Sequence, residues 1–470
     1  MTDRLWKCSA AELAALYAAR KASPVEALGA CLERAAEIGD GLNAIVARND
    51  EAAFRDARAS EARWAAGAQR SPLDGVPLTV KDNIPVAGMP ATWGSRVFAD
   101  YRPQLDETPV PRLREAGAIV FAKTNVPEFT LQGYTSNDLF GTTRNPWDPT
   151  LTPGGSSGGA VACVAAGIGP LAIATDGGGS IRRPASHAGL VGLKPTSGRV
   201  PRRQGFPPIL LDFEVIGPIA RTVSDIVVAT AVMSRADPAV VAQGSFAQFS
   251  VTFASPPERR RVLFVPTFAD APVDPEIAAS VAAAASNVTR LGHEVTESRS
   301  FDLADEINAK WSAVAQTGLA WLMREHSDKR DRLGASIRAM ADAGDAVPAT
   351  AFFDAMHAAH VLRGRLAELF TSYDMILTPT AAALPWPAEI THPDTIAGIP
   401  VGPRGAAIFT GFVNAAGCPA ISIPCRPSHS GLPIGFQLVA PWGCDEDLCA
   451  VGAQYEAAFP WPAVWDRGGS

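Results

Sequence analysis

Two glycine-rich loops near the middle of the chain each present a serine, and these serines are suited to covalent chemistry. Ser156 and Ser180 each follow two or more glycines and stand 180 − 156 = 24 positions apart. The small-residue segment 158–167 predicts a helix between them, and the apolar run 171–175 predicts a strand. A loop–helix–strand–loop unit returns the chain to its starting edge and can bring the serines together. Glycine lacks a Cβ, so neighbouring backbone N–H groups can approach a bound atom closely.

A serine hydroxyl is a poor nucleophile unless a base removes its proton. One candidate base is His187, seven residues after Ser180; the other six histidines lie in the C-terminal half. The second candidate is Lys81, which ends the β-branched apolar run 75–80, a predicted buried strand. A lysine has an ordinary pKa of ~10.4 and must be neutral to accept a proton, and burial favours that form. The alternative interpretation of Lys81 is a structural lysine that leaves the sheet at its edge.

Two other motifs match this stretch, but the predicted secondary structure around them excludes both. Residues 154–158 fit the G-x-S-x-G nucleophile elbow, but the preceding segment 145–153 contains three prolines and cannot form the central strand that this turn requires. Residues 167–172 loosely fit a dinucleotide fingerprint, but they follow a predicted helix and precede a strand, the reverse of the required order. A flexible Gly/Ser linker is the remaining alternative, although a linker has no reason to enclose an apolar helix and strand.

The composition is that of a globular protein, and the net negative charge does not favour binding to polyanions. The chain has 470 residues, 47% of them hydrophobic and 19% charged, and a net charge of 41 − 48 = −7. The densest basic stretch, 199–203, is short and predicts a solvated loop, so neither nucleic acid nor a membrane is an expected partner. The seven cysteines are scattered and contain no CxxC pair, so we expect no disulfides, no zinc site and a reducing, cytoplasmic location.

Helical and strand patterns alternate along the chain, which predicts an α/β fold with a mixed sheet covered by helices on both faces. Residues 1–66 predict an N-terminal helical layer, beginning with two capping boxes at Ser9 and Ser23. The stretch 303–360 is mainly helical and carries aromatic residues that could shape a pocket, although packing is the commoner role for aromatics at helical spacing.

The chain resembles the amidase signature family of Ser-cisSer-Lys hydrolases. The matching motifs are GVPLTVKDN around Lys81, GTTRNPWDP at 141–149, PGGSSGG at 153–159, DGGGSIRRPA at 176–185 and GLVGLKPTSGRV at 189–200. Weaker matches, PAISIPC and PIGFQLVAP, continue toward the C-terminus. The resemblance covers nearly the whole chain. It implies one large domain over 1–470, with a catalytic core at 67–235 and a helical insertion at 300–365 that shapes the substrate pocket.

The resemblance also implies a role for each motif residue. Ser180 would be the acylating nucleophile, Ser156 the proton relay entered through a cis peptide bond, and Lys81 the general base. The backbone N–H groups of Gly177, Gly178, Gly179 and Ser180 would form the oxyanion hole. Substrate-binding residues of the family follow the KTNVPE segment, which corresponds here to Thr130, Leu131, Gln132 and Gly133. The family needs neither a metal nor an organic cofactor, so none is expected.

Three positions depart from the family pattern. Gly177 stands where the family commonly has threonine or another side chain, and three consecutive glycines predict a loosely held oxyanion loop. Arg183 and Ser197 replace the glutamine and tyrosine that are common in the A-type subunits of tRNA-dependent amidotransferases. The expected activity is hydrolysis of a small-molecule carboxamide by a chain that could be a homodimer. The alternatives are the glutaminase subunit of such an amidotransferase, working with a partner protein, and a non-catalytic relative.

Overall fold

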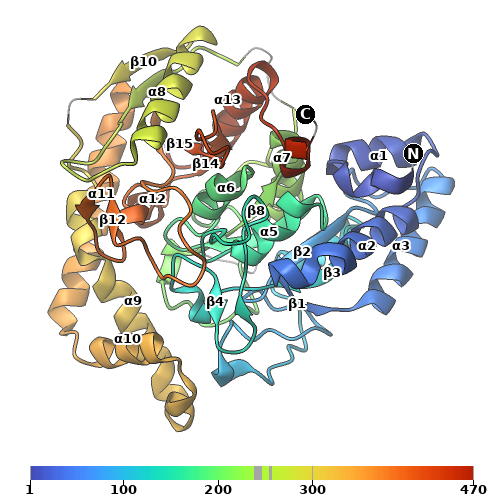
Figure 1. Ribbon diagram of the computed structural model, residues 1–470, viewed down its shortest axis with the longest axis horizontal. Helices are drawn as coiled ribbons and strands as arrows, with labels where there is room; N and C mark the ends of the chain where they lie inside the picture. The colour runs from blue at the N-terminus through green and yellow to red at the C-terminus, as the bar shows by residue number, and fades with distance from the viewer. Residues whose placement is uncertain (1, 238–245, 253–256, 299, 469–470) are drawn as a thin grey trace.

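The computed structural model describes residues 2–237, 246–252, 257–298 and 300–468 (Figure 1). Within these residues, one central mixed sheet of eleven strands carries the fold. In spatial order its strands are β1 (Ile45–Arg48), β3 (Ile119–Thr124), β2 (Pro77–Lys81), β6 (Leu171–Asp176), β8 (Val215–Ala220), β7 (Val191–Lys194), β14 (Ala420–Pro424), β15 (Gly435–Val439), β11 (Met375–Pro379), β9 (Arg261–Phe264) and β10 (Glu294–Glu297). Two short hairpins, β4 (Ser136–Asn137) with β5 (Gly141–Thr142) and β12 (Thr395–Ile396) with β13 (Ile399–Pro400), lie outside it.

Strand direction determines which side chains share an edge of the sheet. The strand β2 lies between β3 and β6 and pairs with both in parallel, and β6 then pairs antiparallel with β8. The carboxyl ends of parallel neighbours meet at one edge, so Lys81 at the end of β2 and Asp176 at the end of β6 lie at the same edge. Lys81 therefore ends an interior strand with its side chain fully buried, which excludes the interpretation of a structural lysine that leaves the sheet toward solvent.

The interior strands of the sheet are buried on both faces, as strand β6 illustrates. Leu171 and Ile173 pack into a core that includes residues of the helices α4 (Val110–Glu115), α7 (Val223–Met233), α8 (Pro275–Arg290) and α13 (Asp445–Ala458). Ala172 and Ala174 instead face the helices α5 (Gly158–Ala166) and α6 (Arg182–Ala188). Side chains of a strand alternate between its two faces, so a strand covered on both sides reads as one continuous apolar run. The predicted α/β class, with helices on both faces of a mixed sheet, is confirmed.

The described residues also form thirteen α-helices, drawn as coiled ribbons in Figure 1. Their bounds are α1 Ala10–Ala18, α2 Pro24–Leu42, α3 Asp50–Ala65, α4 Val110–Glu115, α5 Gly158–Ala166, α6 Arg182–Ala188, α7 Val223–Met233, α8 Pro275–Arg290, α9 Asp305–Glu325, α10 Ala335–Asp345, α11 Ala349–Ser372, α12 Gly411–Ala416 and α13 Asp445–Ala458. Both predicted capping boxes are present, at Ser9 and Ser23.

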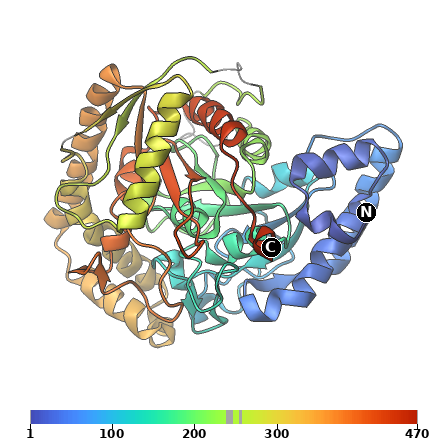
Figure 2. The same ribbon diagram turned by 45° about the horizontal axis from the view of Figure 1, so that its top comes forward.

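The two ends of the sheet carry different helical groups. Helices α1 to α3 lie at the end that contains β1 and β3, whereas α9 to α11 lie at the opposite side of the molecule (Figures 1 and 2). Helix α9 packs against α10, α11 and α12, and together they bury a second core of apolar and aromatic side chains. Within the described part of the chain, no helix is both long and apolar enough to cross a membrane. All seven cysteines are free thiols.

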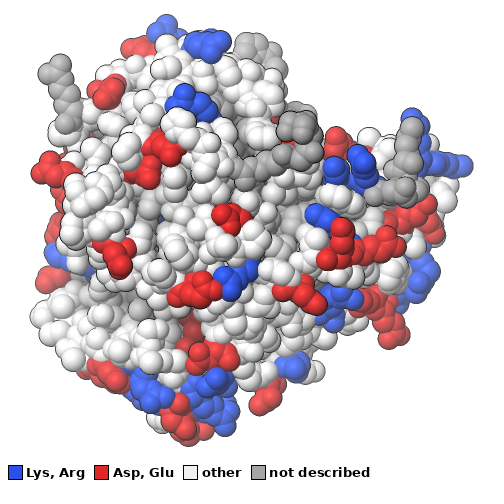
Figure 3. Space-filling view, viewed as in Figure 1, with Lys and Arg blue, Asp and Glu red and all other residues white. Residues whose placement is uncertain are grey.

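The surface charge is mixed, but the basic stretch 199–203 is not the solvated loop that its sequence predicts. On the face seen in Figure 3, basic side chains are interspersed with acidic ones. Arg199 is buried and pairs with Glu446, and Arg202 bridges Glu107 and Glu214, each at 2.7 Å. The prediction fails because carboxylates distant in the sequence neutralise these arginines, and paired charges can leave the solvent.

Candidate active site

The buried end of strand β2 presents Lys81 to the first serine loop. Its side chain is fully buried, and its Nζ donates to Ser156 Oγ at 2.9 Å, to Thr175 O at 3.1 Å and to Thr175 Oγ1 at 2.9 Å. Among the described residues no carboxylate lies within ion-pair distance of this amine. A lysine held in this way is neither a solvated lysine nor one half of a salt bridge.

The surroundings of Lys81 lower its pKa to about 7. Burial is the main cause, because desolvation disfavours the charged ammonium form. The charges of Glu214 and Asp176 act in the opposite direction, and those of Arg202 and Arg183 lower the pKa further. A substantial fraction of this lysine is therefore the neutral amine near neutral pH, the form that can accept a proton.

The first serine loop lies so close to neighbouring backbone that only glycine fits at position 155. The Gly155–Ser156 peptide bond is cis, and a Cβ on Gly155 would lie 2.5 Å from the carbonyl oxygen of Tyr134. The hydroxyl of Thr135 donates to Gly154 O at 2.9 Å and accepts from Gly158 N–H at 3.1 Å. The loop is thus tied to the preceding segment and is not a flexible linker.

Ser180 lies at the end of the second glycine loop, where it faces a cavity of about 390 Å³. Its hydroxyl makes no hydrogen bond to any described residue, including Ser156. The structure therefore joins Lys81 to Ser156 directly and places Ser180 in the cavity wall. The other residues that line the cavity are Thr130, Leu131, Gln132, Gly133, Gly177, Gly178, Arg183, Leu210, Glu214, Trp311, Ser312, Ala315, Gln316, Ser336, Met340, Thr391, His392, Pro403, Arg404 and Ala407.

The backbone N–H groups of the second loop are divided between two environments. Gly179 N–H donates to Asp176 Oδ1 at 2.7 Å. In contrast, the N–H groups of Gly177, Gly178 and Ser180 have no protein acceptor among the described residues. Three donors without a protein partner beside a serine hydroxyl form an arrangement that can bind an oxyanion.

The three consecutive glycines are held more tightly than their sequence predicts. A Cβ on Gly177 would lie 2.5 Å from Leu210 Cδ1, and one on Gly178 would lie 2.8 Å from Trp311 Cζ2. Gly179 has a φ of +112° and would place a Cβ 2.2 Å from Thr410 Oγ1. Neighbours from other elements leave no room for side chains here, so close packing restrains the loop despite its composition.

A buried ion pair supports this loop from below. Arg182 Nη2 donates to Asp176 Oδ1 at 2.9 Å, and Asn414 Nδ2 donates to the same oxygen at 2.9 Å. Burial alone would raise the pKa of Asp176, but the charge and hydrogen bonds of Arg182 and the amide of Asn414 outweigh it and hold that pKa well below its usual range. Asp176 thus stays ionised and anchors Gly179.

The residues predicted from the family motifs are mostly brought together, and several others were missed. Thr130, Leu131, Gln132 and Gly133 all line the cavity of Ser180. Thr175, which binds Lys81, carries a local signal because it directly precedes the motif 176–185. Glu214, His392 and Arg404 come from distant segments and have no motif that marks them, whereas Trp311 belongs to the predicted helical insertion at 300–365.

The candidate base His187 and the variable position Ser197 both lie elsewhere. The Nε2 atom of His187 lies 3.1 Å from Ala383 O, and this ring makes no hydrogen bond to a serine among the described residues. Burial lowers its pKa to about 4. Ser197 lines a different cavity. Across the described segments, no group of three or more His, Cys, Asp or Glu residues is arranged to hold a metal ion.

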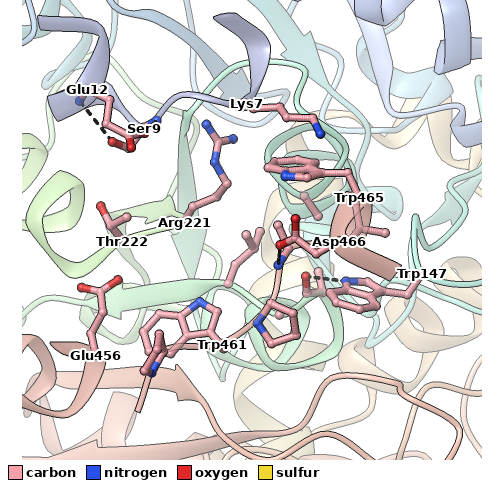
Figure 4. A pocket seen from close by; sticks show the side chains of 18 residues that line it. Lys7, Ser9, Glu12, Trp147, Arg221, Thr222, Glu456, Trp461, Trp465 and Asp466 are labelled. Atoms are coloured by element: carbon pink, nitrogen blue, oxygen red, sulfur yellow. Dashed lines mark hydrogen bonds between the residues drawn. The ribbon is translucent and has the colours of Figure 1, made fainter. Parts of the chain in front are cut away.

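A further cavity, of about 230 Å³, opens between the two ends of the chain (Figure 4). Trp147, Trp461 and Trp465 surround it together with Lys7 and Arg221. None of Lys81, Ser156 and Ser180 is among the described residues that line this cavity. The cavity that contains Ser180 is therefore the candidate active site.

Known proteins resemble this chain in both sequence and fold. The amidase family matches residues 26–449. A glutamyl-tRNA(Gln) amidotransferase subunit of Moorella thermoacetica is 33% identical over 93% of this chain and 93% of its own length. The acylamidase of Rhodococcus erythropolis is 32% identical over 96% of each chain. The crystal structure of a bacterial aryl acylamidase of the amidase signature family superposes with a TM-score of 0.89, at 28% identity and 98% coverage of both chains.

These relatives extend over nearly the full length of the chain and include both amidases and amidotransferase subunits. The match covers the strands and loops that carry Lys81, Ser156 and Ser180. The chain belongs to the amidase signature family and is an amidase-family hydrolase.

Proposed function

We propose that this protein hydrolyses a linear carboxamide to a carboxylate and ammonia or an amine through an acyl-Ser180 intermediate. The observation that carries the proposal is the 2.9 Å hydrogen bond between the buried Lys81 Nζ and Ser156 Oγ. In the neutral amine, two N–H bonds satisfy the two oxygens of Thr175, and the lone pair is left for the Ser156 hydroxyl proton. This arrangement suits a base that acts through a relay.

In the proposed reaction, Lys81 takes the proton of Ser156 as Ser156 takes that of Ser180. The Ser180 oxygen attacks the amide carbon, and the carbonyl electrons move onto oxygen. The free N–H groups of Gly177, Gly178 and Ser180 would stabilise this oxyanion, while Gly179 holds the loop through Asp176. The proton returns from Lys81 through Ser156 to the leaving nitrogen as the C–N bond breaks. Water then attacks the acyl-enzyme by the same route and releases the acid.

The cavity supports a small-molecule substrate. Thr130, Leu131, Gln132 and Gly133 form one wall. Trp311, Ser336 and Met340 come from the stretch 300–365, which we propose shapes the substrate pocket. No nucleic acid, membrane or cofactor takes part in the proposed reaction. Homodimerisation stays a prediction, which multi-angle light scattering of the purified chain would test.

A second candidate function is the glutaminase subunit of a tRNA-dependent amidotransferase. The observation that favours it is the 33% identity to the Moorella thermoacetica amidotransferase chain. It predicts glutamine as the ammonia donor and a partner protein required for full activity. This function would be excluded if the isolated chain hydrolysed simple amides efficiently and did not hydrolyse glutamine faster.

Covalent labelling tests the proposed function before any substrate is known. A fluorophosphonate probe reacts with activated serines, and peptide mass spectrometry locates the adduct. We expect the label on Ser180, with a strong reduction in Lys81→Ala. Ammonia release from a panel of amides then measures turnover. Labelling elsewhere, or full amide turnover by both Lys81→Ala and Ser180→Ala, would overturn the proposal.

A further inference from the structure

Two arginines in the wall of the Ser180 cavity form no ion pair with any described residue. Arg183 and Arg404 both line the cavity, and neither side chain forms an ion pair or hydrogen bond with any described residue. The Arg183 Nε and the Arg404 Nη2 are buried and lack an acceptor. The adjacent Arg182 is very different, since its guanidinium contacts Asp176, Gln437, Asn414 and the Thr410 carbonyl. Arg182 is therefore neutralised within the protein, whereas the two arginines that face the cavity are not.

Close packing restricts where both side chains lie. The Arg404 guanidinium stacks over Trp311 at 4.7 Å from the ring centre, an arrangement that stabilises a cation without neutralising it. A Cβ on Gly411 would lie 3.0 Å from Arg404 Nη2. For Arg183, a Cβ on Gly133 would lie 3.1 Å from Nη1, and one on Gly179 would lie 2.8 Å from Nε. Arg183 is thus packed against the wall residue Gly133 and the loop that carries Ser180.

The electrostatics of the cavity favour an incoming anion. Burial lowers the pKa of Arg183 to about 10, although the charge of Asp176 acts in the opposite direction. Burial, together with the charge of Arg183, lowers the pKa of Arg404 to about 9. Both groups remain cations at neutral pH. The carboxylate in the cavity wall, Glu214, accepts a hydrogen bond from Arg202 at 2.7 Å. Half-buried cations without partners are unfavourable, and an anion supplied by a ligand removes that cost.

We propose that Arg183 and Arg404 form a carboxylate-binding subsite, so that the amide substrate carries a free carboxylate group. The inference rests on the proposed amidase function and specifies its substrate class. A guanidinium group binds a carboxylate through paired N–H donors, which gives both affinity and orientation. The apolar side chains of Leu131, Trp311 and Met340 line the same cavity and suit a short hydrocarbon spacer between the carboxylate and the amide.

The first test measures binding without catalysis. The variant Ser180→Ala keeps the cavity but cannot form an acyl-enzyme. We expect calorimetry to detect glutarate binding to this variant, with affinity about ten-fold or more lower when Arg183→Gln or Arg404→Gln is added. The matched control is Arg259→Gln, because Arg259 is exposed and lies outside the cavity. Equal glutarate affinity in all four proteins, or no binding in any, would overturn the subsite.

The second test compares two amides of equal chain length, succinamate with a carboxylate and butyramide without one. We expect kcat/KM to favour succinamate in the native protein, and the ratio of the two values to fall about ten-fold or more in Arg183→Gln and Arg404→Gln. The ratio cancels any change in the pKa of Lys81, which the Arg183 charge also influences. Arg259→Gln should leave the ratio unchanged.

The two proposals fail in different ways. Equal turnover of succinamate and butyramide by the native protein and both variants would leave the amidase function intact and overturn the carboxylate subsite. Glutarate binding that depends on both arginines, with no turnover of any amide, would keep the subsite and overturn the amidase function.

Discussion

Lys81 Nζ lies 2.9 Å from Ser156 Oγ, although the two residues are 75 positions apart in the chain. The contact arises because strand β2 ends at Lys81 beside β6, at the edge of the sheet where the first serine loop is held. No carboxylate of the described residues lies within ion-pair distance of Lys81, so the contact joins an amine to a hydroxyl rather than two ions. Its chemical value depends on the protonation state of Lys81.

Loss of the amine should abolish most of the activity. We expect Lys81→Ala to lower kcat by about 10²–10⁴-fold, the usual range for removal of a general base. The matched control is Lys21→Ala, since Lys21 is exposed and lies in the N-terminal helical layer. Steady-state ammonia release measures both variants. A Lys81→Ala protein that folds and retains native kcat would exclude Lys81 as the base.

The pH dependence of kcat/KM should follow the neutral fraction of Lys81. Because burial lowers its pKa to about 7, activity should rise about ten-fold per pH unit below 7 and level off above it. Glu214 raises this pKa, so Glu214→Gln should move the rise to lower pH. A profile that stays flat from pH 5.5 to 8.5, or a shift to higher pH in Glu214→Gln, would contradict this assignment.

Glycine substitutions in the second serine loop should differ in severity. In Gly179→Ala the new Cβ meets Thr410 Oγ1 and the positive φ disfavours alanine, so we expect a loss of about 10²–10³-fold in kcat as the oxyanion donors move. In Gly177→Ala the Cβ would clash with the end of the flexible Leu210 side chain and make ordinary contacts with Glu214, so the loss should be smaller. Kinetics at matched folded concentration compares the two. Equal losses would mean that packing around the loop does not govern its geometry.

The Asp176–Arg182 pair should contribute to stability as well as to loop geometry. Asp176→Asn leaves a buried guanidinium without its counter-ion, so we expect the free energy of unfolding to fall by about 3–5 kcal/mol. Urea unfolding monitored by circular dichroism measures the change. The matched control, Asp374→Asn, alters a solvent-exposed pair with Arg261 and should have little effect. Equal effects of the two variants would contradict this role.

The same pair gives stability a pH dependence with a defined sign. The pKa of Asp176 is well below its usual range in the folded protein, so the folded state binds this proton less readily than the unfolded state. The contribution is therefore fully present above the ordinary aspartate pKa of ~3.9 and is lost as pH falls below it. Asp176→Asn should show a weaker loss of stability between pH 5 and 3 than the native protein. An identical acid dependence would argue against the paired carboxylate.

Local sequence patterns sufficed for the elements that hold the site. The apolar run 75–80 predicted the strand that carries Lys81, and the segments 158–167 and 171–175 predicted helix α5 and strand β6. These predictions succeed because side-chain periodicity and glycine placement act over a few residues, independently of the rest of the fold. The linear motifs likewise identified the wall residues Thr130 to Gly133.

Only the tertiary structure decided which distant residues complete the site and how charges pair. It packs Leu210, Trp311 and Thr410 against the three glycines, so a loop that looks loose in sequence is restrained. It pairs Arg202 with both Glu107 and Glu214, yet leaves Arg183 and Arg404 unpaired in the cavity. Such outcomes depend on which side chains from separate elements occupy the same volume, and that information is not present in any short stretch of sequence.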